Sequence, residues 1–99
     1  MKKSIIFRNE AIGDIAEAVD WYESKVVRLG FDFIQRLDST VEKISRHPER
    51  YPIVHRKARM VPLRQFPYLV IYCVFDDFVS VIAVMHGKRH STRWQSRLP

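Results

Sequence analysis

The segment HGKRHSTRW (residues 86–94) combines side chains that can hold an anion with side chains that can move a proton. Its charged or titratable residues are His86, Lys88, Arg89, His90 and Arg93. Arginine and lysine bind phosphates and carboxylates through charge-assisted hydrogen bonds, and a guanidinium can form two such bonds in parallel. Histidine exchanges a proton close to neutral pH. The segment contains no acid, so we predict that it binds an anionic or acidic target.

A second basic group lies earlier in the chain, around a predicted strand at residues 58–66. Its members are Arg56, Lys57, Arg59 and Arg64. If this strand and the strand before residue 87 share a sheet, the two basic groups approach each other at one end of it. We predict that Arg64, His86 and Arg89 contact the target or act catalytically. Arg59, Lys88, His90 and Arg93 would add charge around them. The alternative is that His86 only ends a strand among surface arginines.

Positive charge is concentrated in the second half of the chain. The sequence has 17 basic and 11 acidic residues. Residues 1–49 carry 8 basic and 9 acidic side chains, whereas residues 50–99 carry 9 basic and 2 acidic ones, a net charge of +7. A merely solubilising surface would spread its charge more evenly. The asymmetry therefore predicts a polyanion or an acidic protein as partner.

The sequence gives little support to a phosphate-binding loop, a nucleophilic hydrolase or a metal site. It has no glycine-rich phosphate loop, no GxSxG and no HExxH motif, and its single cysteine, Cys73, excludes the usual zinc clusters. His86 and His90 are four residues apart, but no helix is expected after Gly87, so we predict no metal and no cofactor. The acids at 10–23 alternate with apolar residues and predict a solvated helix face. We expect a cytoplasmic protein with no membrane segment.

The pattern of apolar residues predicts the elements that position these side chains. Residues 4–8 form a first strand, and a three-four repeat between 12 and 26 predicts a helix. A second repeat between 33 and 44 follows Gly30 and stops at Pro48. Strands at 58–66, 68–75 and 78–86 complete the order β-α-α-β-β-β. We predict one α+β domain over residues 1–99, with a mainly antiparallel sheet and a helical hairpin packed on one face. Trp94 either packs the C-terminal segment onto this fold or stacks on a base.

Four stretches of this sequence resemble one known family. They are DIAEAVDWYE (14–23), LGFDFIQRLDSTVEKISRHPERYP (29–52), RQFPYLVIYCVF (64–75) and VIAVMHGKRHSTRW (81–94). In this order they are similar to the RelE/ParE toxins of bacterial type II toxin–antitoxin modules, and the ending is most similar to the ParE or plasmid-stabilisation branch. The resemblance implies the fold just described. It also implies a cognate antitoxin, encoded next to the toxin and assembling with it into a hetero-oligomer.

The two branches of the family differ in mechanism. ParE-like toxins inhibit DNA gyrase, whereas RelE-like toxins cut mRNA in the ribosomal A site without a metal, using basic residues of the sheet and a C-terminal tyrosine or similar group. Arg59 and Arg64 match the arginine positions, but no tyrosine follows Tyr72. We therefore expect growth arrest by gyrase inhibition, without catalysis. A ribosome-dependent endoribonuclease is the alternative, and a non-toxic basic module that binds nucleic acid is the third.

Overall fold

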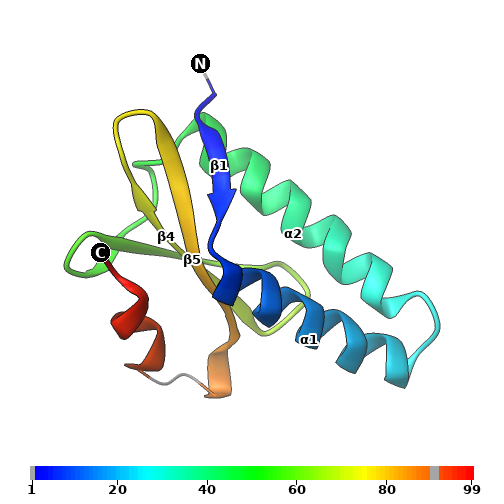
Figure 1. Cartoon of the computed structure of the whole chain (residues 1–99). Helices are drawn as coiled ribbons and strands as arrows, with labels where there is room; N and C mark the ends of the chain where they lie inside the picture. The colour runs from blue at the N-terminus through cyan, green and yellow to red at the C-terminus, as the bar shows by residue number, and fades with distance from the viewer. Residues whose placement is uncertain (1, 90–91) are drawn as a thin grey trace.

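The computed structural model describes residues 2–89 and 92–99 of the chain (Figure 1). Its elements are β1 (Ser4–Phe7), α1 (Asn9–Lys25), α2 (Leu29–Arg46), β2 (Ile53–His55), β3 (Ala58–Pro62), β4 (Tyr68–Val74), β5 (Phe78–His86) and the short 3₁₀ helices η1 (Gly87–Arg89) and η2 (Thr92–Arg97). The predicted α+β class and helical hairpin are confirmed. The sheet has one strand more than predicted, because the three-residue β2 pairs with the edge of β3.

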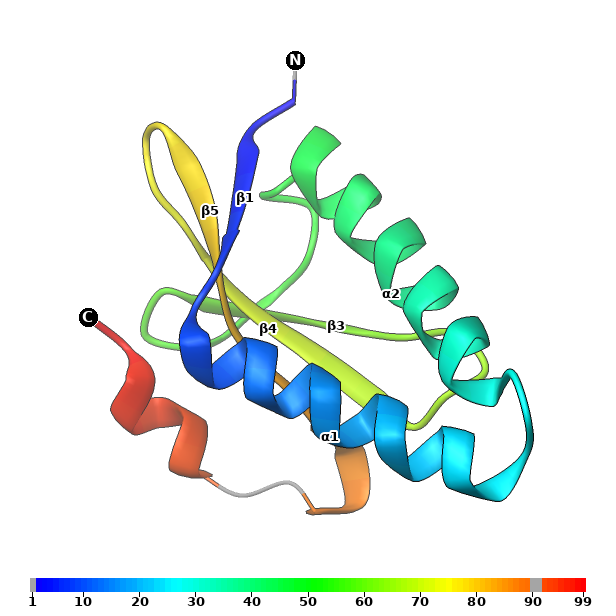
Figure 2. The same cartoon turned by 45° about the vertical axis from the view of Figure 1, so that its right-hand side comes forward.

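The five strands form one sheet in the order β1-β5-β4-β3-β2. β1 runs parallel to β5, and the other neighbouring pairs are antiparallel. The two helices cover one face, while the C-terminal segment lies against the other (Figures 1 and 2). The pleat of β4 explains its unbroken apolar sequence: Val70 and Tyr72 pack toward the helices, and Ile71 and Cys73 pack toward Trp94. Trp94 is 2% exposed, so the prediction that it packs the C-terminal segment onto the fold is confirmed.

A β-bulge interrupts the pairing of β4 with β5. Ile71 lies opposite Ala83, but the next residue, Tyr72, lies opposite Val81. Ile82 is therefore the extra residue, and both Ile82 and Ala83 pack on the side of Trp94. A bulge leaves main-chain groups of the extra residue outside the ladder and bends the strand. The sequence contains no signal for it, because the residues around it, 81–84, are all apolar.

The helical hairpin turns three residues earlier than Gly30 suggests. α1 ends at Lys25 and α2 already begins at Leu29, after Arg28 in a left-handed conformation (φ 75°). The Glu23 carboxylate accepts hydrogen bonds from the main-chain N–H groups of Arg28 (2.9 Å) and Gly30 (3.0 Å). These two donors belong to the unsatisfied group at the start of α2. Glu23 is exposed, as predicted for the acids of this helix, and it also caps the start of α2.

Gly30 is needed because the helices touch there. A Cβ atom on Gly30 would lie 2.9 Å from the carbonyl oxygen of Val19. The close approach buries an apolar face of each helix against the sheet. No helix in the described ranges, 2–89 and 92–99, is long and apolar enough to span a membrane.

Candidate functional site

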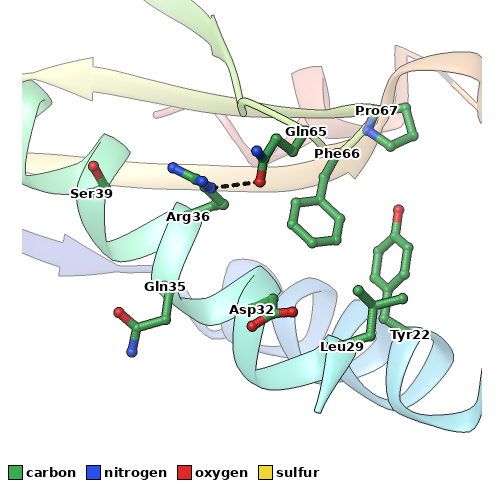
Figure 3. A pocket seen from close by; sticks show the side chains of 9 residues that line it. All are labelled: Tyr22, Leu29, Asp32, Gln35, Arg36, Ser39, Gln65, Phe66 and Pro67. Atoms are coloured by element: carbon green, nitrogen blue, oxygen red, sulfur yellow. Dashed lines mark hydrogen bonds between the residues drawn. The ribbon is translucent and has the colours of Figure 1, made fainter. Parts of the chain in front are cut away.

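The loop between β3 and β4 (residues 63–67) presents Arg64 at one end of the sheet. The N–H of Leu63 donates to the carbonyl of Tyr68 at 2.9 Å, which closes the loop. Gln65 takes a left-handed conformation (φ 70°), and its side-chain oxygen accepts a 3.0 Å hydrogen bond from Nε of Arg36 on α2 (Figure 3). Arg64 itself is exposed. The loop is therefore held at both its base and its tip, while no hydrogen bond or ion pair to a residue in 2–89 or 92–99 fixes the Arg64 side chain.

An aromatic cluster supports this loop from the helix side. Tyr22 of α1 packs edge-to-face on Phe66 with ring centroids 4.9 Å apart, and Phe33 of α2 packs edge-to-face on Phe66 at 5.3 Å and on Tyr68 at 5.1 Å. Each such pair adds about 0.5–1.5 kcal/mol beyond the area that it buries. The tyrosine of the WYE stretch and the aromatics of FPY thus form one unit, which joins both helices to the Arg64 loop.

The end of β5 lies directly beside this loop. His86 pairs with Tyr68, and the N–H of Gly87 donates to the carbonyl of Pro67 at 2.7 Å. The imidazole of His86 packs edge-to-face on Tyr68 at 5.3 Å, and its Nδ1 accepts a 3.0 Å hydrogen bond from the N–H of Lys88. Because Nδ1 is the acceptor, the neutral ring carries its proton on Nε2. Nε2 is then the nitrogen left to face a ligand.

The structure brings most of the predicted basic residues to this end of the sheet. We name the set formed by Arg64, His86, Lys88, Arg89 and Arg93 the basic edge. Arg64 lies in the loop, and η1 carries Lys88 and Arg89 next to it. Arg93 lies on η2 and lines a cleft together with His86. His90 falls outside the described residues. Whether these side chains contact a target stays a prediction.

Arg59 lies apart from the basic edge and holds another part of the fold. It pairs with Tyr72 in the middle of the sheet, and its Nη1 donates to the carbonyls of Tyr51 (2.7 Å) and Glu49 (3.2 Å). The Tyr72 hydroxyl donates to the carbonyl of Pro48 at 2.6 Å, and burial raises the pKa of Tyr72 to about 12. Arg59 and Tyr72 therefore fasten the connection between α2 and β2. Arg56 and Lys57 also lie at the far end of β3, near Leu98 and Pro99.

Two clefts flank the basic edge. One, of about 780 Å³, lies between α2 and the Arg64 loop, and Figure 3 shows its mixed lining of Tyr22, Leu29, Asp32, Gln35, Arg36, Ser39, Gln65, Phe66 and Pro67. The other, of about 500 Å³, lies between α1 and the end of β5. It has acids of α1 on one wall (Asp14, Glu17, Asp20) and His86, Arg93 and Arg97 among the residues opposite. Asp14 is partly buried there, which corrects the prediction that the acids of this helix only face solvent.

The arrangement suits binding of an acidic or anionic surface more than it suits hydrolysis by a metal. Across residues 2–89 and 92–99, no three His, Cys, Asp or Glu side chains come together in a way that could hold a metal ion. Arg64 and Lys88 are exposed on a loop and a helical turn that the main-chain hydrogen bond from Gly87 to Pro67 fixes to each other. Preorganised cations of this kind steer and orient a negatively charged partner.

Comparisons with known proteins agree with the resemblance noted in the sequence. The family model described as the ParE toxin of the type II toxin–antitoxin system parDE matches residues 5–90. Among solved structures, a chain of a chromosomal ParDE toxin–antitoxin system from P. aeruginosa superposes with a TM-score of 0.76. The match covers 86% of this chain and 96% of that chain at 13% sequence identity, so it shows a shared fold. A search of curated protein sequences found no match. The family match spans most of the chain, and the protein belongs to the ParE toxin family of type II toxin–antitoxin systems.

Proposed function

We propose that this protein arrests growth by inhibiting DNA gyrase when it is free of its antitoxin. The observation that carries the proposal is the match to the ParE toxin model over residues 5–90. The basic edge would contact gyrase, with Arg64, His86 and Arg89 at its centre and Lys88 and Arg93 beside them. Inhibition of this kind needs a positioned surface and no bond-breaking step, so the proposed mechanism involves no catalysis by this protein.

The antitoxin is the partner that would prevent the basic edge from contacting its target. The second half of the chain has a net charge of +7, and complementary charge speeds and orients association. We propose an antitoxin encoded next to this toxin, which covers the basic edge and forms a hetero-oligomer with the toxin. Co-expression of the adjacent reading frame should suppress growth arrest and yield a complex that co-purifies. If no neighbouring product does either, the toxin–antitoxin assignment loses its partner.

Induction of the toxin alone separates the possible targets. Gyrase inhibition should produce filamentous cells and DNA-damage signalling while translation continues at first. Growth arrest with an immediate stop in translation and without DNA-damage signalling would point to the ribosome. If neither pattern appears, filter binding to RNA and DNA tests the third function, a non-toxic nucleic-acid-binding module.

One observation favours ribosome-dependent mRNA cleavage as the second candidate. His86 lies against Tyr68 within the basic edge, and histidine is the residue type that most often transfers protons in catalysis. His86→Gln keeps the approximate size and hydrogen-bonding capacity but cannot exchange a proton near neutral pH. Cleavage of mRNA on purified ribosomes should be abolished by this change, whereas gyrase inhibition should be affected only mildly.

A further inference from the structure

Asp14 of α1 connects three parts of the fold through one carboxylate. Its Oδ2 accepts a 3.1 Å hydrogen bond from the N–H of Val84 on β5 and a 2.7 Å hydrogen bond from Nη1 of Arg97 on η2. Its Oδ1 lies 3.4 Å from Nη2 of the same arginine. The two side chains are only 20% and 19% exposed. Charge-assisted hydrogen bonds at such sites are stronger than those between neutral groups.

Arg97 completes this arrangement at the bulge of β5. Its Nη1 also donates to the carbonyl of Ile82, the extra residue, at 3.1 Å. β1 pairs with β5 only as far as Val81, so from Ile82 onward no strand among the described residues covers this edge. On this edge the Asp14 carboxylate accepts a hydrogen bond from the N–H of Val84, and the Arg97 guanidinium donates one to the carbonyl of Ile82. The pair therefore takes the place of a neighbouring strand on β5 beyond the end of β1, next to the bulge.

The C-terminal segment has one other strong attachment. Trp94 is buried among Ala58, Ile71, Cys73 and Ala83. The C-terminal segment that carries it lies on the face of the sheet away from the helices (Figure 2). Its indole N–H has no hydrogen-bond partner in the described part of the chain, and an unpaired buried donor weakens the gain from burial. η2 spans only Thr92–Arg97, which is too short to be stable as an isolated helix. The segment depends on its anchors.

We propose that Asp14 is a positioning residue that clamps the C-terminal segment through Arg97 and thereby fixes the basic edge. Arg93, Trp94 and Arg97 all belong to η2, so the clamp on Arg97 helps to fix the orientation of the helix that carries Arg93. Without the clamp, η2 is held to the sheet mainly by the apolar packing of Trp94 and Leu98, and it can shift more readily relative to Arg64. The proposal rests on the proposed function, because it assumes that the basic edge contacts the target.

The test compares Asp14→Ala and Asp14→Asn with the wild type and with Asp38→Asn. Asp38 is an exposed aspartate on α2, so its variant repeats the change in charge away from the clamp. Limited trypsin digestion followed by mass spectrometry measures release of the segment, since Lys88, Arg93 and Arg97 are cleavage sites. We expect cleavage to be about tenfold faster in Asp14→Ala, which corresponds to about 1.4 kcal/mol. Asp14→Asn should lie between the wild type and Asp14→Ala, because its amide oxygen still accepts one hydrogen bond.

Growth arrest and inhibition of purified gyrase are measured on the same variants together with thermal melts. The proposal predicts that toxicity falls in the order of cleavage rates while each variant melts cooperatively as a folded protein. Unchanged cleavage in Asp14→Ala would overturn the clamp, and faster cleavage with full toxicity would overturn its link to function. If the wild type arrests growth but leaves gyrase active, the proposed target is wrong, and the growth assay still decides the role of Asp14.

A charge-swapped variant separates the clamp from a simple ion pair. Asp14→Arg combined with Arg97→Asp restores opposite charges but places a guanidinium against the N–H of Val84 and a carboxylate against the carbonyl of Ile82. The clamp therefore predicts that the swap does not restore slow cleavage. Full restoration would show that charge alone holds the segment and would contradict the role of the main-chain contacts.

Discussion

Replacing Gly30 by alanine should destabilise the protein, although the same change usually stabilises a helix. Alanine has the higher helix propensity by about 0.8–1.0 kcal/mol in a helix interior, and less of this gain applies in the first turn of α2. The new Cβ would lie 2.9 Å from the carbonyl oxygen of Val19 and 3.0 Å from both Cγ1 of Val19 and Oε1 of Glu23. Overpacking of this kind costs about 1–3 kcal/mol.

The net change in stability depends on how the protein relieves the close contact between the new Cβ atom and the Val19 carbonyl. The Val19 carbonyl belongs to α1 and cannot rotate away, so the helices must separate or the Glu23 cap must move. Loss of a cap costs roughly 1 kcal/mol. We therefore expect a net destabilisation of about 1–2 kcal/mol. For a domain of this size, each kcal/mol lowers the melting temperature by roughly 4–8 °C.

Gly13→Ala provides the matched control. Gly13 lies within α1, and a Cβ atom there would meet nothing within 4 Å. It should raise stability by about 0.5–1 kcal/mol. Urea unfolding followed by circular dichroism measures both variants on one scale. If Gly30→Ala stabilises the protein as much as Gly13→Ala does, the close approach of the two helices is wrong.

Three further changes test the rest of the fold. Trp94→Ala should cost about 3–5 kcal/mol in urea unfolding, and an unchanged midpoint would mean that the indole is not part of the core. Tyr72→Phe should cost about 1 kcal/mol through its lost hydrogen bond to Pro48. The pKa of Tyr72 in the folded protein is raised from 10.0 to about 12. The resulting contribution to stability is therefore present below pH 10 and falls as the pH rises toward 12. Thermal melts between pH 10 and 12 should show this fall in melting temperature in the wild type and not in Tyr72→Phe. Hydrogen bonds from Lys2 and Arg46 lower the pKa of Glu42 below 4.5, so the contribution of Glu42 to stability is present above that pH and is lost during acidification. In Glu42→Gln the melting temperature should therefore depend less on pH below about pH 4.5. The same acid dependence in this variant and in the wild type would contradict this.

Periodicity predicts the main elements because burial dominates their pattern. The repeat of the second helix is confirmed, since Phe33, Leu37 and Ile44 are buried. The repeat of the first helix predicts the helix but only part of its buried face: Ile12 and Val26 are exposed, and Ala11 and Ala18 are buried instead. β2 escapes the prediction, since three residues are too few to carry a period. The bulge at Ile82 escapes it as well, because an apolar residue suits either face of a sheet that is covered on both sides.

The sequence predicts which basic residues belong to the candidate site, but it does not predict the contacts that hold them in place. The sequence identifies the basic residues, and topology then places Arg64 beside His86. It also suggests that Arg59 belongs with them, but Arg59 lies within β3, whereas Arg64 lies in the loop that follows this strand. The carbonyls of Glu49 and Tyr51 accept the hydrogen bonds that Arg59 donates. Asp14 and Arg97 are 83 residues apart in the chain, and no local pattern indicates that they meet. Contacts of this kind depend on the three-dimensional arrangement.

Inhibition of purified DNA gyrase by the basic edge is the central claim, and a supercoiling assay tests it directly. The wild-type toxin and the Arg64→Ala, Arg89→Ala double variant are added to gyrase with relaxed plasmid. Truncation of the exposed Arg64 should cost about 0.5 kcal/mol or less, and a thermal melt checks that the double variant is folded. We predict that the wild type blocks supercoiling and that the folded double variant does not. Undiminished supercoiling with the wild type, or equal inhibition by both proteins, would contradict the account.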